Sequence, residues 1–149
     1  MVKIGDALPD FVLPDENGNP VDICDYKCNE PIIIFFYPKD DTPGCTIEAC
    51  AFRDNYDEFK LNGAIIIGIS ADDPTSHLKF KKKYSLPFKL LSDEDSAVHK
   101  MFGVTKTLGL FPGRTTYISD RKGFVQQIFN SQFFPKKHVF EALRTISQL

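Results

Sequence analysis

The stretch PIIIFFYPKDDTPGCTIEAC, residues 31–50, holds a predicted strand, a turn and the start of a predicted helix. Residues 31–38 form a short apolar run of β-branched and aromatic residues between two prolines, which is typical of a strand buried on both faces. From Gly44 to Leu61, apolar residues recur at steps of four and three, which predicts one helix with a buried stripe. Cys45 therefore lies in the first turn of a helix at the carboxyl edge of a central strand, where open α/β sheets commonly bind ligands.

Turn signals and apolar runs predict the other elements. They are a small hairpin within residues 8–31, a buried strand at 64–70, a helix from 72–75 to Tyr84, a short helix at 95–102, a hairpin of 115–119 with 124–129, and a helix at 136–149. This order predicts an α/β fold with three layers, a mixed central sheet and an N-terminal β-hairpin. We expect one domain over residues 1–149, with no repeat or internal linker.

Composition excludes several classes of protein. The formal net charge is -2, and 42% of the residues are hydrophobic, so we expect neither a general attraction for nucleic acid nor disorder. The basic run KFKKKY is interpreted as a solvated helix face. No apolar segment reaches the length of a membrane span, and the N-terminus MVKIGDALPDF lacks the apolar core of a signal peptide. We therefore expect a cytoplasmic protein without a membrane partner.

The predicted position of Cys45 favours reactivity. Free backbone N–H groups and the helix dipole would stabilise a thiolate there. Thr42 lies three residues earlier, where its hydroxyl could face the same pocket, and Pro38 and Pro43 would stiffen the loop. The alternative interpretation is that Cys45 is a small core residue and that Thr42 is only an N-cap.

The distance between Cys45 and Cys50 has a mechanical consequence. Five residues along an ideal helix separate two Cα atoms by roughly 8.7 Å. A disulfide needs Cα atoms within about 7 Å. If these two cysteines bond, the first turn or two of the helix must unwind, and the helix would act as a redox switch.

A family resemblance follows from these residues. Pro38, Thr42 and Cys45 match the P-x-x-x-T-x-x-C signature of peroxiredoxins. The segment YPKDDTPGCTIEACAFRD closely resembles the Q-type subfamily, also called bacterioferritin comigratory proteins. The similarity extends from GDALPDFVLPDENGNPV to GRTTYISDRKG, and so covers nearly the whole chain.

The resemblance implies a thioredoxin-like fold and a thiol-dependent peroxidase that reduces hydrogen peroxide and organic hydroperoxides. Cys45 would be the peroxidatic cysteine and Cys50 the resolving cysteine, linked through a sulfenic acid and an intramolecular disulfide. Arg114 would stabilise the thiolate and the polarised peroxide, Thr42 would hydrogen-bond to them, and Pro38 would wall the pocket. The resemblance further implies a thioredoxin or glutaredoxin-like reductant, no metal, haem or flavin, and a monomer.

Other interpretations stay open at this point. One alternative is a thioredoxin-like disulfide reductase, which is disfavoured because the spacing is C-x4-C and not C-x-x-C. Another is a peroxide-sensing redox relay protein, in which peroxide would oxidise Cys45 without catalytic turnover. Cys24 and Cys28 match no position of the family's usual catalytic set, so we expect Cys24 to pack as a small hydrophobe and Cys28 to be exposed. The alternative is a second redox pair or a docking point for a reductant. The cysteine spacing is poor for zinc. His77, His99 and His138 are scattered singly, which favours surface or core roles.

Overall fold

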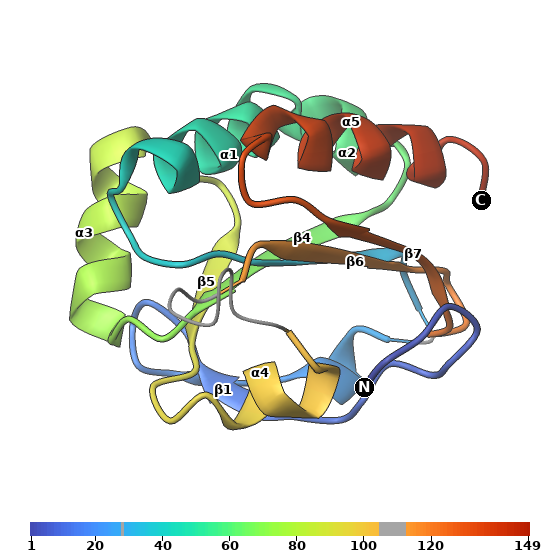
Figure 1. Cartoon of the computed structure of the whole chain (residues 1–149), viewed down its shortest axis with the longest axis horizontal. Helices are drawn as coiled ribbons and strands as arrows, with labels where there is room; N and C mark the ends of the chain where they lie inside the picture. The colour runs from blue at the N-terminus through green and yellow to red at the C-terminus, as the bar shows by residue number, and fades with distance from the viewer. Residues whose placement is uncertain (28, 105–112) are drawn as a thin grey trace.

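The structure is a computed structural model that describes residues 1–27, 29–104 and 113–149. Its centre is a five-stranded sheet, shown in Figure 1. Across the sheet the strands are β5 (Lys89–Ser92), β4 (Ile65–Ser70), β3 (Ile32–Phe36), β6 (Thr115–Ser119) and β7 (Val125–Asn130). Strand β3 runs parallel to β4 and antiparallel to β6, which confirms the prediction of a mixed sheet with this strand at its centre.

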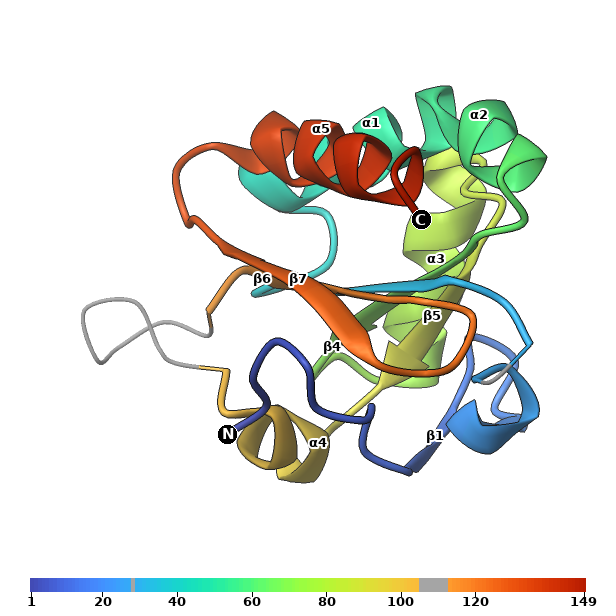
Figure 2. The same ribbon diagram turned by 90° about the vertical axis from the view of Figure 1, so that its right-hand side faces the viewer.

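Two layers cover the sheet. Helices α1 (Pro43–Asp54), α2 (Tyr56–Leu61) and α5 (Pro135–Ile146) lie on one side, while α4 (Ala97–Phe102) and the N-terminal hairpin lie on the other (Figures 1 and 2). The hairpin pairs β1 (Val12–Pro14) with β2 (Pro20–Asp22), as predicted. Helix α3 (Pro74–Tyr84) flanks the sheet next to β5.

Strand β3 supplies side chains to both layers because successive residues of a strand point to opposite faces. Ile33 and Phe35 join the core beneath α1 and α5, whereas Ile34 and Phe36 join the core beneath α4 and the hairpin. Gly68 on β4 makes room for this packing, since a Cβ atom there would lie 2.8 Å from the ring of Phe35. The absence of hydrophobic alternation in the sequence thus reflects burial on both faces.

The prediction of one continuous helix from Gly44 to Leu61 is wrong. The structure divides it into α1 and α2 at Asn55, whose backbone angles (φ -107°, ψ 11°) are not helical. The Asn55 side chain donates a hydrogen bond to the carbonyl of Ala51 at 2.8 Å. Such local bonding by Asn competes with the helical backbone, and the break leaves Cys45 and Cys50 together in α1.

The sequence interpretation also missed β5. This edge strand has four residues and begins with a lysine, so its pattern is too short to identify. Its pairing with β4 buries Leu90 in one core and Leu91 in the other.

Within the described residues, no helix combines the length and the apolar character needed to cross a membrane.

Candidate active site

Cys45 occupies the predicted position. Helix α1 begins at Pro43, directly after the loop that leaves the carboxyl end of β3. The first helical hydrogen bond runs from the N–H of Thr46 to the carbonyl of Thr42 at 2.8 Å. The Cys45 side chain is only 1% exposed, so the first turn of α1 holds this thiol beneath the protein surface, at the end of a helix where free N–H groups favour negative charge.

Arg114 reaches Cys45 from a distant part of the chain. It directly precedes β6, and Thr115 of β6 is paired with Phe36, the last residue of β3. This antiparallel register brings the start of β6 to the edge of the sheet where α1 begins. The Arg114 Nη2 atom lies 3.4 Å from the Cys45 Sγ atom. Gly44 permits the approach, because a Cβ atom on it would lie 3.0 Å from the same nitrogen.

Glu48 fixes the other side of the guanidinium group. Arg114 Nη1 donates to Glu48 Oε1 at 2.9 Å, and Arg114 Nε donates to the carbonyl of Gln132 at 3.3 Å. Burial lowers the pKa of Arg114, but the charge interactions and hydrogen bonds with Glu48 and Cys45 raise it by more. The net result is a raised pKa for Arg114. The guanidinium group is therefore a cation fixed by hydrogen bonds, with its Nη2 edge directed at the Cys45 sulfur.

The Glu48 carboxyl is itself in an unusual state. It has no exposed side-chain surface, and burial raises its pKa to about 8 although Arg114 acts in the opposite direction. Burial thus drives this carboxyl toward its neutral form, while the ion pair with Arg114 favours the charged form. In either form Glu48 accepts the hydrogen bond from Arg114 Nη1 and leaves Nη2 directed at Cys45.

His138 lies behind Glu48. Its Nε2 donates to the carbonyl of Ser131 at 2.7 Å, and its Nδ1 accepts from the hydroxyl of Thr116 at 2.8 Å. Burial, together with the nearby Arg114, lowers the pKa of His138 to about 4. This neutral ring lies with its Nδ1 atom 3.5 Å from Glu48 Oε2 and closes the site from the side of α5.

Neither Glu48 nor His138 was identified from the sequence. Glu48 carried a usable signal, since it follows Cys45 by three residues and so shares its helix face with the apolar stripe. An acid on a buried stripe needs a cationic partner or a proton. His138 gave no such signal, because its burial depends on how α5 packs against β6 and β7.

Thr42 and Pro38 lie in the loop before α1. The Thr42 hydroxyl donates to the carbonyl of Lys39 at 2.8 Å and makes no capping bond to the helix. Its hydrogen is thus engaged, while the lone pairs of its oxygen can accept a proton donor. Pro38 is half-buried at the start of the same loop.

Cys50 lies further along α1 and is half-buried, and both it and Cys45 are free thiols. Burial raises the pKa of Cys50, with opposing effects from Arg53 and Asp54. Because both residues belong to one continuous helix, the distance argument from the sequence applies, and a bond between them requires α1 to unwind.

The expectation that Cys24 packs as a small hydrophobe is wrong. Ile23 takes the buried position of this segment, and the next residue, Cys24, is exposed. Its Sγ donates to the Asp10 carboxylate at 3.1 Å. This bond, with burial and Asp22 as further causes, raises the pKa of Cys24 to about 11. Cys28, and with it the possible pair of Cys24 and Cys28, lies outside the described residues.

The geometry defines the class of protein. The buried thiol of Cys45 sits at a helix N-terminus, faced by a guanidinium that is fixed by a buried acid. Such a site suits a thiolate that attacks a small, polar electrophile, and it lies at the edge of a mixed sheet where ligands are commonly bound. The protein is therefore of the thiol-enzyme class.

Comparisons with known proteins identify the family. Residues 4–128 match the AhpC/TSA family. The chloroplastic peroxiredoxin Q of Oryza sativa subsp. japonica is 52% identical over 149 residues, which cover 99% of this chain and 68% of that protein. The chain belongs to the AhpC/TSA family and is a peroxiredoxin of the Q type, as the sequence resemblance implied.

Solved structures agree with this assignment. Peroxidoxin BcpB from Mycobacterium tuberculosis superimposes with a TM-score of 0.92 at 37% identity and covers 100% of this chain and 99% of that chain. The bacterioferritin comigratory protein of Xanthomonas campestris gives a TM-score of 0.80 at 30% identity, over 93% of this chain and 98% of that chain. The predicted thioredoxin-like peroxiredoxin fold is confirmed.

The family defines the activity. The chain is a thiol-dependent peroxidase, with a peroxide substrate and a thioredoxin-type reductant. The name of the rice relative places that protein in the chloroplast, so the expectation of a cytoplasmic protein is not confirmed.

Proposed function

We propose that Cys45 is the peroxidatic nucleophile and that Arg114 is its principal electrostatic partner. The contact of 3.4 Å between Arg114 Nη2 and Cys45 Sγ carries this proposal. The guanidinium favours the thiolate before the reaction and the partial charge on the peroxide oxygens during it. Thr42 Oγ1 accepts the hydrogen of the incoming hydroperoxide, and Pro38 shields the loop from water.

In the first step the Cys45 thiolate attacks the terminal oxygen of the hydroperoxide. A sulfur–oxygen bond forms, the oxygen–oxygen bond breaks, and the alkoxide or hydroxide that leaves takes up a proton. Sulfur loses two electrons and the peroxide gains them, which gives Cys45 sulfenic acid and an alcohol or water. This step needs the intact first turn of α1, since the helix start and Arg114 act together on sulfur.

In the second step Cys50 attacks the sulfur of the sulfenic acid, a disulfide forms between Cys45 and Cys50, and the hydroxyl group leaves as water. Unwinding of α1 is required for this step. A thioredoxin or glutaredoxin-like dithiol then restores both thiols by exchange. Helix α1 thus alternates between a wound form that reacts with peroxide and an unwound form that holds the disulfide.

The range of substrates includes organic hydroperoxides in this proposal. Alkyl peroxide reduction is described for the bacterioferritin comigratory protein of Xanthomonas campestris. In this chain Ile47, two residues after Cys45 on α1, is exposed and lines an apolar pocket together with Phe133 and Phe134. We further propose that the enzyme acts as a monomer. A cytoplasmic location stays a prediction from the sequence.

The test uses one equivalent of hydrogen peroxide added to the reduced protein, with rapid alkylation of the remaining thiols and peptide mass spectrometry. We expect loss of two thiols and a bond between Cys45 and Cys50. A Cys50→Ser variant should lose one thiol and accumulate a sulfenic acid that dimedone traps on Cys45. Oxidation that begins at another cysteine, with Cys45 unmodified, would contradict the assignment. A wild-type protein that oxidises but does not turn over with thioredoxin would favour a peroxide sensor.

A further inference from the structure

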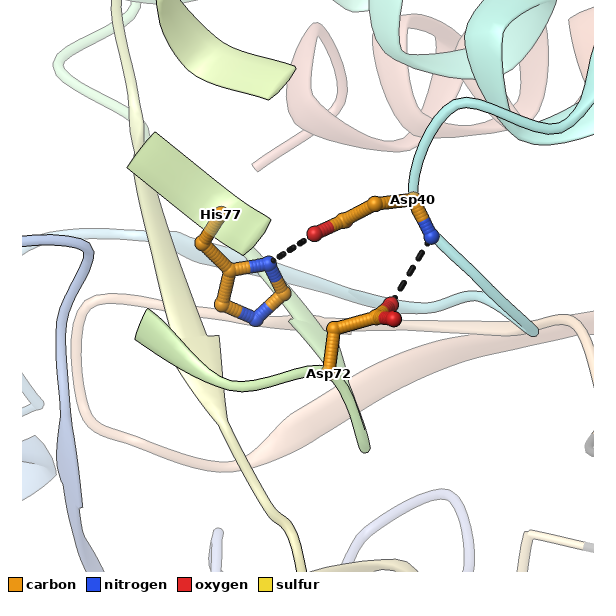
Figure 3. A group of neighbouring side chains, drawn as sticks. All are labelled: Asp40, Asp72 and His77. Atoms are coloured by element: carbon orange, nitrogen blue, oxygen red, sulfur yellow. Dashed lines mark hydrogen bonds and ion pairs between the residues drawn. The ribbon is translucent and has the colours of Figure 1, made fainter. Parts of the chain in front are cut away.

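A second group of polar side chains, two of them buried, lies at the loop that leads to Cys45. Asp40 comes from this loop, Asp72 from the segment after β4, and His77 from α3, and Figure 3 shows the three side chains directed toward one another. Asp40 is 8% exposed and His77 is fully buried. Neither side chain takes part in the chemistry proposed above.

The Asp40 side chain is hydrogen-bonded at both oxygens. Oδ2 lies 2.7 Å from His77 Nδ1 and accepts from the Ser76 hydroxyl at 2.8 Å, while Oδ1 accepts from the Tyr37 hydroxyl at 2.6 Å. Burial, followed by the charge of Asp40, holds the pKa of Tyr37 well above its usual range, so this hydroxyl keeps its hydrogen and donates. The carboxylate therefore connects the end of β3 to α3.

The backbone of Asp40 is tied down as well. Its N–H donates to Asp72 Oδ2 at 2.8 Å, the contact drawn in Figure 3, and the same oxygen accepts from the Ser70 hydroxyl at 2.7 Å. Ser70 is the last residue of β4. Asp40 alone thus connects the loop to the end of β3, to the segment after β4 and to α3.

His77 must share a hydrogen with Asp40. Its Nε2 lies 3.0 Å from the carbonyl of Leu91, and a carbonyl only accepts, so Nε2 bears a hydrogen. Its Nδ1 faces a carboxylate oxygen at 2.7 Å, a distance at which two bare acceptors would repel, so a further hydrogen lies between them. A metal ion could bind here only by displacing that hydrogen. The group is therefore a closed hydrogen-bonded anchor.

The next residue adds a second attachment to α3. Asp41 adopts a left-handed backbone conformation with φ at 56°, and its carboxylate accepts from Lys83 Nζ and from the Tyr84 hydroxyl, each at 2.8 Å. From Pro43 onward the chain belongs to α1, whose residues Cys45 and Glu48 both contact Arg114. The border between the anchored loop and the helix that must unwind therefore falls between residues 41 and 43.

We propose that Asp40 and His77 are positioning residues that form a fixed anchor for the opening and closing of α1. The proposal rests on the disulfide cycle proposed above. While the first turns of α1 unwind, the anchor keeps residues 38–41 in place, so that Cys45 leaves and re-enters a pocket whose loop wall does not move. Asp40 and His77 touch neither substrate nor sulfur and act through this loop.

The anchor has opposite consequences for the two chemical steps. Attack on peroxide needs the wound form, and its apparent rate constant scales with the fraction of molecules in that form. Disulfide formation needs the unwound form. Loss of the anchor should therefore slow the oxidation of Cys45 by about tenfold and leave the closing of the disulfide as fast as before or faster.

The experiment measures both steps in His77→Gln and Asp40→Asn. In a Cys50→Ser background, rapid mixing with hydrogen peroxide and dimedone trapping gives the second-order rate constant of Cys45 oxidation. With Cys50 present, saturating peroxide and timed alkylation give the first-order rate constant of disulfide closing. Ser76→Ala removes only one donor to Asp40 and should shift both constants in the same directions by a smaller factor, which keeps the test valid should a stronger variant fail to fold.

The matched control is His99→Gln. His99 pairs with Asp93 in a second buried contact of the same chemistry, next to Phe36 on the opposite face of the sheet. At equal loss of thermal stability, His99→Gln should leave both constants within about twofold of wild type. The proposal is overturned if His77→Gln also leaves both rate constants within about twofold of wild type. It is likewise overturned if His77→Gln and Asp40→Asn slow Cys45 oxidation and disulfide closing by the same factor. A wild-type protein that forms no bond between Cys45 and Cys50 would instead overturn the proposed function.

Discussion

Cys45 and Cys24 are both free thiols, yet their surroundings are opposite. Cys45 is buried beside the guanidinium of Arg114. Cys24 is exposed, but it donates to Asp10, and the acids around it raise its pKa to about 11. Cys24, the exposed thiol among the described cysteines, is thus held protonated. The contrast predicts that local charge, more than access to solvent, determines the reactivity of these two thiols.

The most direct test of this contrast replaces each thiol in turn. Cys45→Ser should abolish peroxide reduction because serine is not a comparable nucleophile, whereas Cys24→Ser should keep the wild-type rate. Turnover of hydrogen peroxide with thioredoxin, thioredoxin reductase and NADPH measures both. Residual turnover in Cys45→Ser that disappears in the double variant would show that Cys24 is a second active thiol.

Removal of the Arg114 charge should slow the reaction of Cys45 with peroxide without abolishing it. Arg114→Gln deletes the charge opposite sulfur, and we expect the second-order rate constant with hydrogen peroxide to fall about 10²–10³-fold. Arg121→Gln is the control, because Arg121 is an exposed arginine that contacts the carbonyl of Asn62. It follows the end of β6, whereas Arg114 precedes the start of that strand. Equal rates in the two variants would rule out the electrostatic role of Arg114.

The state of Glu48 determines how much of that charge Cys45 receives. The pKa of Glu48 is about 8 in the fold against an ordinary value of 4.5. Above pH 4.5 the unfolded chain releases a proton that the folded chain keeps, so this group contributes stability that is lost as pH rises toward 8. We expect Glu48→Gln, which cannot ionise, to gain stability relative to wild type between pH 5 and pH 8.

Urea unfolding at pH 5, 6.5 and 8 measures this difference. His138 is common to both proteins, and its lowered pKa of about 4 acts the other way, with stability lost as pH falls below about 6.5. Its effect cancels in the comparison. A stability difference that does not change with pH would mean that Glu48 is ionised in the folded protein and that it neutralises part of the charge on Arg114.

The smallest effect is expected at Cys24. Asp10→Asn removes the carboxylate that accepts from its Sγ, the largest cause of its raised pKa, so the pKa of Cys24 should fall toward its ordinary value. Alkylation of Cys24 by iodoacetamide at pH 8.5, followed by peptide mass spectrometry, should become several-fold faster, with no change in peroxide turnover. An unchanged alkylation rate would mean that Asp22 alone controls this thiol.

Much of the fold could be predicted from local patterns. Residues 31–50 showed the apolar run of β3, the proline-rich loop and the start of α1. These features could be predicted because strand burial and helix periodicity depend on residues that are close together in the sequence. The errors have local and non-local causes. Asn55 divides the predicted helix through its own side chain, whereas β5 becomes a strand only by pairing with β4.

The candidate site divides in the same way. Cys45, Thr42 and Pro38 belong to one short motif, and Arg114 was expected only through the family resemblance. The contact between Arg114 and Cys45 spans 69 residues and depends on the antiparallel register of β6 with β3. The position of Glu48 on the buried stripe could have been found from the sequence, but its partner Arg114 could not. His138 was missed because its burial depends on elements that are distant in the chain.

The sequence alone therefore determined the element that presents the thiol and the spacing of Cys45 and Cys50, which makes the unwinding of α1 necessary for a disulfide. Both follow from backbone geometry over a few residues. Only the tertiary structure decided which charges face each cysteine and how Asp40 is bound to His77, 37 residues away. Those contacts join separate strands and helices, and the energies of charged and buried groups depend on their neighbours in space and not on their neighbours in the chain.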